Sequence, residues 1–331
     1  MPERKPKTFQ YRYVEGLSNG RTLEQLLRPV LYHEYKTIKQ RAESVTGDDP
    51  DEQVRRCVNH KAKDGNALFG EMILYALGQN KQTVTVNEDL EELPTEQIRA
   101  PKTSAGEARE FIEGVVYFMV IDNHMVVVQS LALRDRDLEG HLNWLLFECA
   151  NKLEDGEVIV LKRELSVTAK TQMSGVRSVQ IGAPLMRREQ TPAPDSPTHK
   201  GNLRTRFVLT DMGKEVLEAI FSSGGLDGLG VDDLEGADNL EVQITVKRKG
   251  GSTRPGNPAE NTITALTTHL RHSHMEDVVV DTKQGKIQGE TLYLTEKRHI
   301  ECEKGVPLRN KLFHSMKEWL EQKIEDGSIT V

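Results

Sequence analysis

Lysine and arginine are concentrated in the middle of this 331-residue chain. Residues 161–210 carry nine Lys or Arg against three acids, whereas residues 211–240 carry one Lys against eight acids. Cationic side chains that share one surface can replace the counterions of a nucleic-acid backbone, so the first segment is typical of phosphate contact. A solvated or internally paired charge pattern is the alternative. The residues predicted to contact DNA are Lys162, Arg163, Arg187, Arg188, Lys200, Arg204, Arg206, Lys247, Arg248, Lys249 and Arg254.

The basic, glycine-containing run at 247–256 is the nearest approach to a phosphate-binding loop. A Walker loop needs Gly, four residues and then Gly-Lys-Ser/Thr before a helix, because backbone amides must wrap the phosphates and the Lys must reach them. The run reads Lys-Arg-Lys-Gly-Gly-Ser-Thr-Arg-Pro-Gly, which lacks that order. We interpret it as a basic hairpin tip that touches a DNA backbone without specific geometry.

Imidazoles and carboxylates gather at 269–277, where a metal site is conceivable. His269, His272 and His274 precede Glu276 and Asp277, and these are metal-ligand residue types. On a continuing helix His274 would point away from the other two imidazoles, so an exposed helix end is the simpler interpretation. The run at 57–60, with Cys57 and His60, lacks the paired spacing of a zinc site.

No common catalytic motif is present. The sequence contains neither Gly-x-Ser-x-Gly nor His-Glu-x-x-His, which are signatures of serine hydrolases and zinc proteases. A metal-dependent nuclease assembled from dispersed carboxylates stays open. So does a protein-binding adaptor that uses the acidic runs at 88–96 and 226–238. We expect a binding protein rather than an enzyme, without cofactor or metal, whose main partner is double-stranded DNA.

Length and composition indicate the fold class and the number of domains that position these residues. A chain of this length predicts two domains, here an α+β fold built on mixed or antiparallel sheets with flanking helices. We place an N-terminal domain at 1–157 and a C-terminal domain at 158–331, which contains the basic segment and a Pro-rich loop at 190–200. The longest apolar run, 114–121, is too short to span a bilayer. Three scattered cysteines and a charged N-terminus without an apolar segment predict a cytoplasmic protein.

Periodicity predicts the individual elements. The clearest is a β-hairpin with strands at 115–121 and 125–130 around the turn 122–124. Thr22 followed by Gln25 predicts the capped start of a helix, and 68–77 is apolar but fits either a helix or a strand. Other expected strands are 8–14, 158–161, 204–209, 240–247, 278–281 and 291–294, and other expected helices are 137–153, 211–221, 261–271 and 308–324.

The order of elements from residue 208 onward resembles the RexA family of prophage exclusion proteins. The resemblance rests on the helix 213–221, the acidic connector 226–234, the strand with a basic end 240–249, and the segments 276–285 and 292–299 before a C-terminal helix. The stretch Leu-Met-Arg-Arg at 185–188 is also similar in character.

This resemblance implies a homodimer that binds DNA without marked sequence preference. It also implies a role in abortive infection, an antiviral defence in which the protein senses phage infection and signals to a small membrane protein of the RexB type. A Kiwa-type defence protein, which is likewise linked to DNA and a membrane partner, is a neighbouring possibility.

Overall fold

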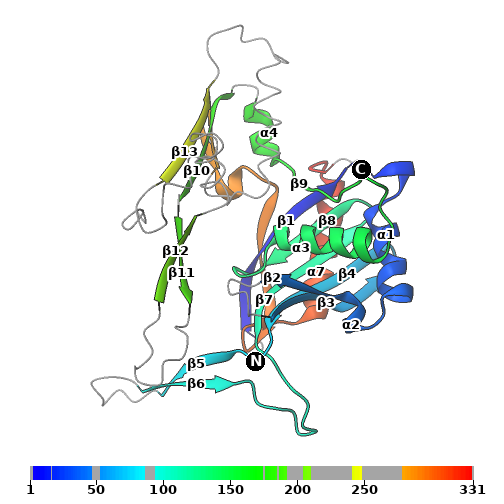
Figure 1. Ribbon diagram of the computed structural model, residues 1–331. Helices are drawn as coiled ribbons and strands as arrows, with labels where there is room; N and C mark the ends of the chain where they lie inside the picture. The colour runs from blue at the N-terminus through cyan, green and yellow to red at the C-terminus, as the bar shows by residue number, and fades with distance from the viewer. Residues whose placement is uncertain are drawn as a thin grey trace. The chain divides into compact units, whose positions relative to one another are not determined.

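The computed structural model describes residues 3–15, 17–46, 53–85, 94–173, 176–184, 186–191, 204–209, 241–247 and 278–329. The chain forms two compact units (Figure 1). Unit 1 comprises Met1–Glu164 and Leu294–Val331, and unit 2 comprises Leu165–Tyr293. Every strand pair among the described residues is antiparallel, which confirms an α+β fold.

A nine-stranded sheet forms the centre of unit 1. Its order is β17-β16-β1-β8-β7-β4-β3-β2, with β9 also paired to β1. A separate two-stranded ribbon is made by β5 (Asn80–Val84) and β6 (Thr95–Arg99). The strands of the large sheet are β1 (Glu3–Val14), β2 (Ala42–Thr46), β3 (Gln53–Asp64), β4 (Ala67–Ala76), β7 (Ile112–Ile121), β8 (His124–Gln129), β9 (Leu161–Arg163), β16 (Thr295–Glu303) and β17 (Val306–Pro307).

The predicted hairpin is confirmed as β7 and β8. Their two-residue turn places Asp122 at a positive φ of 52°, a conformation that Asp and Asn adopt more readily than most residues. The next residue, Asn123, accepts a hydrogen bond through Oδ1 from the Leu23 amide at 2.8 Å. The hairpin turn therefore supports the start of the first helix, where the predicted cap of Thr22 and Gln25 is also found.

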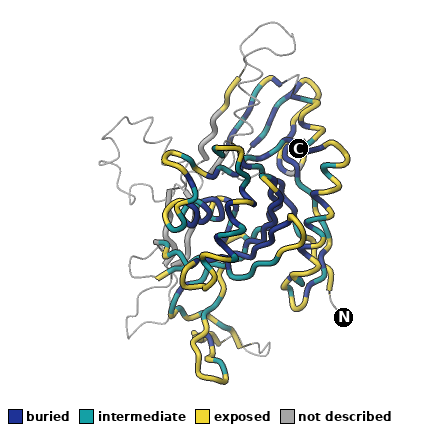
Figure 2. The backbone as a smooth tube through the Cα atoms, turned by 90° about the vertical axis from the view of Figure 1, so that its right-hand side faces the viewer, coloured by how far each residue is buried: buried dark blue, intermediate teal, exposed yellow. Residues whose placement is uncertain are grey.

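Helices cover both faces of this sheet. Helices α1 (Leu23–Pro29) and α3 (Asp135–Asn143), with their π-helical extensions η2 (Val30–Glu34) and η3 (Trp144–Cys149), share a hydrophobic core with Met72, Phe118 and Val127. The predicted C-terminal helix is α7 (Arg309–Glu325), whose Trp319 packs on Phe9 across the other face. Figure 2 shows the buried backbone concentrated in the centre of unit 1. The remaining helical turns are η1 (Ser18–Gly20) and α2 (Ile38–Arg41).

Alternation along the central strands decides which residues meet each layer of helices. Phe9 and Tyr11 of β1 belong to the α7 core, whereas Gln10 and Arg12 are buried polar residues that point toward the opposite face. Gly70 of β4 gives room to an aromatic ring of the neighbouring strand. A Cβ at this glycine would lie 2.1 Å from Cζ of Phe118, so no larger residue fits without repacking.

Unit 2 contains two small sheets. The first has the order β13-β10-β14-β15 and a core that includes Val179, Ile181 and Val280. The second is a two-stranded ribbon of β11 and β12. The described elements are α4 (Val167–Met173), β10 (Val176–Pro184), β11 (Met186–Thr191), β12 (Arg204–Leu209), β13 (Glu241–Lys247), β14 (Val278–Thr282), β15 (Gly285–Gln288) and η8 (Gly289–Thr291).

The expected domain division at 157/158 requires correction. The chain from Leu294 onward belongs to unit 1, because β16 pairs with β1 from Glu3↔Cys302 to Gln10↔Thr295. Unit 2 is consequently an insertion between two parts of unit 1. The strand expected at 291–294 is also wrong: a 3₁₀ turn occupies Gly289–Thr291 and the strand begins at Thr295.

The position of one strand and one open choice are also settled. The strand expected at 158–161 lies instead at Leu161–Arg163, and the apolar segment 68–77 is the strand β4. The predicted helices 211–221 and 261–271, the His269–Asp277 cluster and the part of the Pro-rich loop from 192 to 200 lie outside the described residues.

Candidate nucleic-acid interface

Four of the predicted DNA-contacting arginines lie on one β-ribbon. Arg187 and Arg188 belong to β11, and Arg204 and Arg206 belong to β12. The antiparallel register runs from Met186↔Leu209 to Thr191↔Arg204, with one acid, Glu189, directly opposite Arg206. The register places Arg187, Arg204 and Arg206 on one face of the ribbon, together with Glu189, and Arg188 on the other face.

A fifth predicted residue lies in the other sheet of unit 2. Lys247 is the last residue of β13, pairs in register with Ser178 of β10 and is exposed. The remaining predicted contacts of this unit, Lys200, Arg248, Lys249 and Arg254, lie outside the described residues.

Lys162 of β9 is committed to an intramolecular ion pair. Its ammonium group contacts the carboxylate of Glu15, and its side chain is 28% exposed. A phosphate would have to compete with this carboxylate, so the sequence-based assignment of Lys162 as a free DNA contact is weakened.

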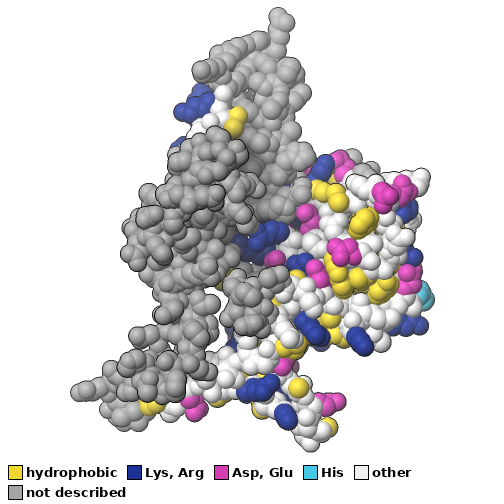
Figure 3. Space-filling view, viewed as in Figure 1, with side chains coloured by type: hydrophobic (Ala, Val, Ile, Leu, Met, Phe, Trp, Pro, Cys, Tyr) yellow, Lys and Arg dark blue, Asp and Glu magenta, His cyan; other side chains and the backbone are white. Residues whose placement is uncertain are grey.

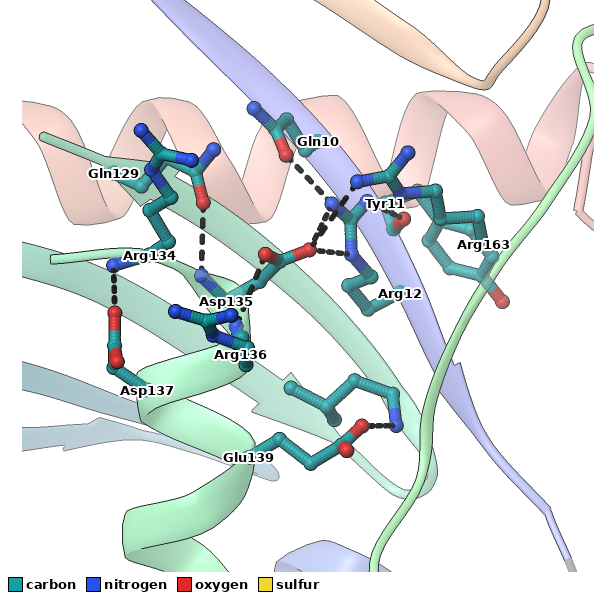
Figure 4. A network of polar contacts seen from close by, with 11 residues as sticks. Gln10, Tyr11, Arg12, Gln129, Arg134, Asp135, Arg136, Asp137, Glu139 and Arg163 are labelled. Atoms are coloured by element: carbon teal, nitrogen blue, oxygen red, sulfur yellow. Dashed lines mark hydrogen bonds and ion pairs between the residues drawn. The ribbon is translucent and has the colours of Figure 1, made fainter. Parts of the chain in front are cut away.

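Arg163 is incorrectly predicted as a DNA contact. Only 6% of the residue is exposed, and Nη2 lies 3.9 Å from Oδ2 of Asp135. The same carboxylate oxygen accepts a hydrogen bond from Nε of Arg12 at 2.9 Å. Strand alternation turns Arg163 inward beside Arg12, so its charge is used within the protein (Figure 4).

The polar network around Arg12 and Asp135 connects β1, β8, β9 and α3. Gln10 accepts a hydrogen bond from Nη2 of Arg12 at 2.7 Å, and Gln129 accepts one from the Asp135 amide at 2.9 Å. Burial alone would raise the pKa of Asp135, but the charges of Arg12 and Arg163 outweigh it and lower that pKa. The carboxylate is therefore held ionised as the anchor of a structural network (Figure 4).

A second polar cluster, which the sequence did not reveal, joins β2, β3 and α3 around the buried His141. Nε and Nη2 of Arg56 bind the two carboxylate oxygens of Glu43 at 2.6 and 2.8 Å. Nδ1 of His141 lies 2.9 Å from Oε2 of Glu43, and the indole of Trp144 stacks on the imidazole at a centroid distance of 5.3 Å. Nε2 of His141 has no hydrogen-bond partner among the described atoms.

Electrostatics keep this cluster as a carboxylate beside a neutral imidazole. Burial lowers the pKa of His141 although Glu43 opposes the shift. Burial would raise the pKa of Glu43, but hydrogen bonds from His141 and Arg56 lower it to about 2. No local motif announces this arrangement, because its members come from three separate elements.

Within the described ranges, no group of three or more His, Cys, Asp or Glu side chains could hold a metal ion. In the same part of the chain, every helix is too short or too polar to cross a membrane.

No protein-family model matches the sequence, and no curated protein is significantly similar to it.

Proposed function

We propose that this protein binds double-stranded DNA without sequence preference, through the β11–β12 ribbon of unit 2. One observation carries the proposal: six cross-strand pairs contain four arginines and a single acid. A strand of six residues extends over about 20 Å, and this length of duplex carries roughly twelve phosphate charges. The ribbon therefore has the length and the charge to contact several phosphates at once.

Arginine suits this role better than lysine. Its guanidinium forms two parallel hydrogen bonds to a phosphate, is always charged and is less strongly hydrated than an ammonium group. Contacts to phosphate oxygens carry no direct sequence information. Binding through this ribbon would accordingly depend on salt far more than on base sequence.

The resemblance to the RexA family supports a wider role for this binding. We propose that the protein is a cytoplasmic homodimer of a phage exclusion system, in which occupancy of DNA during infection is signalled to a small membrane protein. The alternatives that stay open are a Kiwa-type defence protein, a metal-dependent nuclease and a protein-binding adaptor, and the experiment below separates the last two from DNA binding.

The test is fluorescence anisotropy with two labelled duplexes of unrelated sequence, in salt from about 50 to 200 mM. The three arginines that share one face of the ribbon should contribute about −2.7 to the slope of log Kobs against log salt, equally for both duplexes. Arg187→Ala with Arg206→Ala should make the slope less steep by about 1.8.

Lys283→Ala with Lys286→Ala is the matched control, because both lysines are exposed in the same unit and lie outside the ribbon. Its slope should equal that of the wild type. No binding at low salt would favour the adaptor, and magnesium-dependent cleavage of the duplex would favour the nuclease. Unequal binding of the two duplexes would refute the lack of sequence preference.

A further inference from the structure

Two lysines lie against one tyrosine ring in unit 1. Lys61 and Lys63 occupy alternate positions of β3 and therefore point to the same face of the sheet. Their Nζ atoms lie 5.0 and 5.4 Å from the ring centroid of Tyr32 in η2, within the range of cation–π attraction. Figure 3 shows Lys and Arg side chains distributed over one face of unit 1, among acidic and hydrophobic ones.

Two further cations act on the same place. Lys36 is exposed in the turn between η2 and α2, and Arg41 closes that turn by donating hydrogen bonds to the carbonyl oxygens of Tyr35, Lys36 and Val58. Burial first, and then the charges of Arg41 and Lys36, lower the pKa of Lys61. The lysines thus repel one another and are held together by the fold.

The neighbouring acids do not neutralise this charge. Glu34 pairs with Lys152 at 2.8 Å, Asp64 pairs with Lys317 at 2.6 Å, and Glu24 pairs with Arg28. Throughout the described ranges, no carboxylate forms an ion pair with Lys36, Lys61 or Lys63. This differs from Lys162, whose charge is compensated by Glu15.

We propose that Tyr32, Lys36, Lys61 and Lys63, here called the Tyr32 patch, bind the phosphodiester backbone of DNA as a second contact surface, located in unit 1. The proposal rests on the proposed function for the identity of its ligand, but it does not need the β11–β12 ribbon.

Geometry favours a regular polyanion as the occupant. Two residues along a strand cover about 6.6 Å, which is close to two phosphate steps of about 3.4 Å along the axis of one DNA strand. The backbone positions of Lys61 and Lys63 therefore match the spacing of separate phosphates, and Lys61 keeps its charge although its ammonium donates a hydrogen bond to the Leu31 carbonyl oxygen. A bound phosphate would also supply the negative charge that this patch lacks.

A lipid surface is a poorer occupant on structural grounds. A helix that inserts into a membrane interface turns an apolar face outward. The helix beside the patch, α1 with its extension η2, instead buries Leu23, Leu27, Val30 and Leu31 in the core of unit 1.

The test compares full-length variants by anisotropy with a labelled duplex over the same salt series. Lys36→Glu with Lys63→Glu changes two exposed residues, so the fold should be kept, as thermal unfolding will check. Loss of two phosphate contacts should make the salt slope less steep by about 1.8 and weaken binding at low salt by about tenfold or more. Lys36→Arg with Lys63→Arg should bind like the wild type.

Lys304→Glu with Lys311→Glu is the control, because it changes the net charge equally at two other exposed positions of unit 1. It should leave the salt slope unchanged. If Lys36→Glu with Lys63→Glu also leaves it unchanged, the inference is overturned. Lys61→Gln offers an independent check, with an expected change in slope of about 0.9.

The ribbon variant separates this inference from the proposed function. Loss of slope in the patch variant alone would support the Tyr32 patch and refute the ribbon, whereas loss in the ribbon variant alone would do the reverse. No DNA binding by the wild type would refute both. Patch-dependent binding to phosphatidylserine vesicles with unchanged DNA binding would overturn the inference in favour of a membrane surface.

Discussion

Unit 1 contains two groups of cationic side chains that have opposite surroundings. Arg12 and Arg163 are buried, and both lie beside the carboxylate of Asp135. Lys36 and Lys63 are exposed around Tyr32, and neither forms an ion pair with a described carboxylate. Both groups carry positive charge, but only the second has charge available to an external partner.

The difference teaches that the count of basic residues along a sequence does not locate a binding surface. A buried charge is expensive unless it is paired, so the fold supplies Asp135 and neutral oxygens to Arg12. Exposed lysines need no such partner, because water solvates them until a ligand arrives.

The largest expected effect comes from breaking the buried group. Asp135→Ala leaves the fully buried Arg12 without its carboxylate, and loss of one partner of a buried ion pair costs about 3 to 5 kcal/mol. We expect the free energy of unfolding, measured by urea denaturation with circular dichroism, to fall by this amount.

Glu15→Ala is the surface comparison, because it breaks the pair with the partly exposed Lys162. Its expected cost is at most about 1 kcal/mol. Similar losses in the two variants would contradict the distinction between buried and surface charge.

A medium effect is expected from acidification of the His141–Glu43 cluster. The pKa of His141 lies below its ordinary 6.5 in the fold, so as the pH falls below that value the unfolded chain takes up the proton first. The contribution of His141 to the free energy of unfolding is therefore fully present above pH 6.5. Below this pH the free energy of unfolding declines by up to about 1.4 kcal/mol per pH unit for one proton.

Glu43 adds a further decline at lower pH. Its pKa of about 2 in the fold lies below the ordinary 4.5, so its contribution is present above pH 4.5 and is lost as the pH falls toward 2. Urea denaturation of the wild type and of His141→Asn at pH 7 and pH 5.5 tests the histidine part. The variant should lose less stability over this interval, and equal losses would show that His141 does not control it.

The smallest effect on stability is expected in the Tyr32 patch. Lys63→Met should change the free energy of unfolding by no more than about 0.5 kcal/mol. It should also make the salt slope of DNA binding less steep by about 0.9. Lys162→Met should leave that slope unchanged, because Lys162 is paired with Glu15. Equal slopes for both variants would contradict the distinction between lysines without an ion pair and lysines paired with a carboxylate.

The spacing of apolar residues predicted the elements whose structure depends on neighbouring residues alone. The β7–β8 hairpin alternates around a turn that Asp122 can form, and the apolar residues of α7 recur at helical spacing. β4 was ambiguous because it is buried along most of its length and lacks alternation. The pairing of β16 with β1 could not be predicted, since neither strand carries a signal for so distant a partner.

The candidate interface was predictable only as a charge density. Arg187, Arg188, Arg204 and Arg206 lie on one ribbon, but only the strand register shows that Arg188 is on the opposite face from the other three. The prediction of Arg163 as a DNA contact was wrong because a three-residue strand gives too little alternation to show which residue points inward. The Tyr32 patch was missed because Lys36 lies in a turn far from β3, although alternating Lys61 and Lys63 were a usable signal on a correctly assigned strand.

The insertion of unit 2 between Glu164 and Leu294 has a consequence for synthesis on the ribosome. The carbonyl of Glu164 accepts a hydrogen bond from the Leu294 amide at 2.8 Å, so the chain leaves and rejoins unit 1 at neighbouring points. At roughly 5 to 20 residues per second, translation of Leu165–Tyr293 takes about 6 to 26 s. During this interval Phe9 and the surrounding apolar face are not yet covered by α7, and β1 is not yet paired with β16. Until β16 and α7 emerge, the nascent chain therefore exposes an apolar face and an unpaired strand edge. Chaperones can bind to these surfaces, and other chains can aggregate on them.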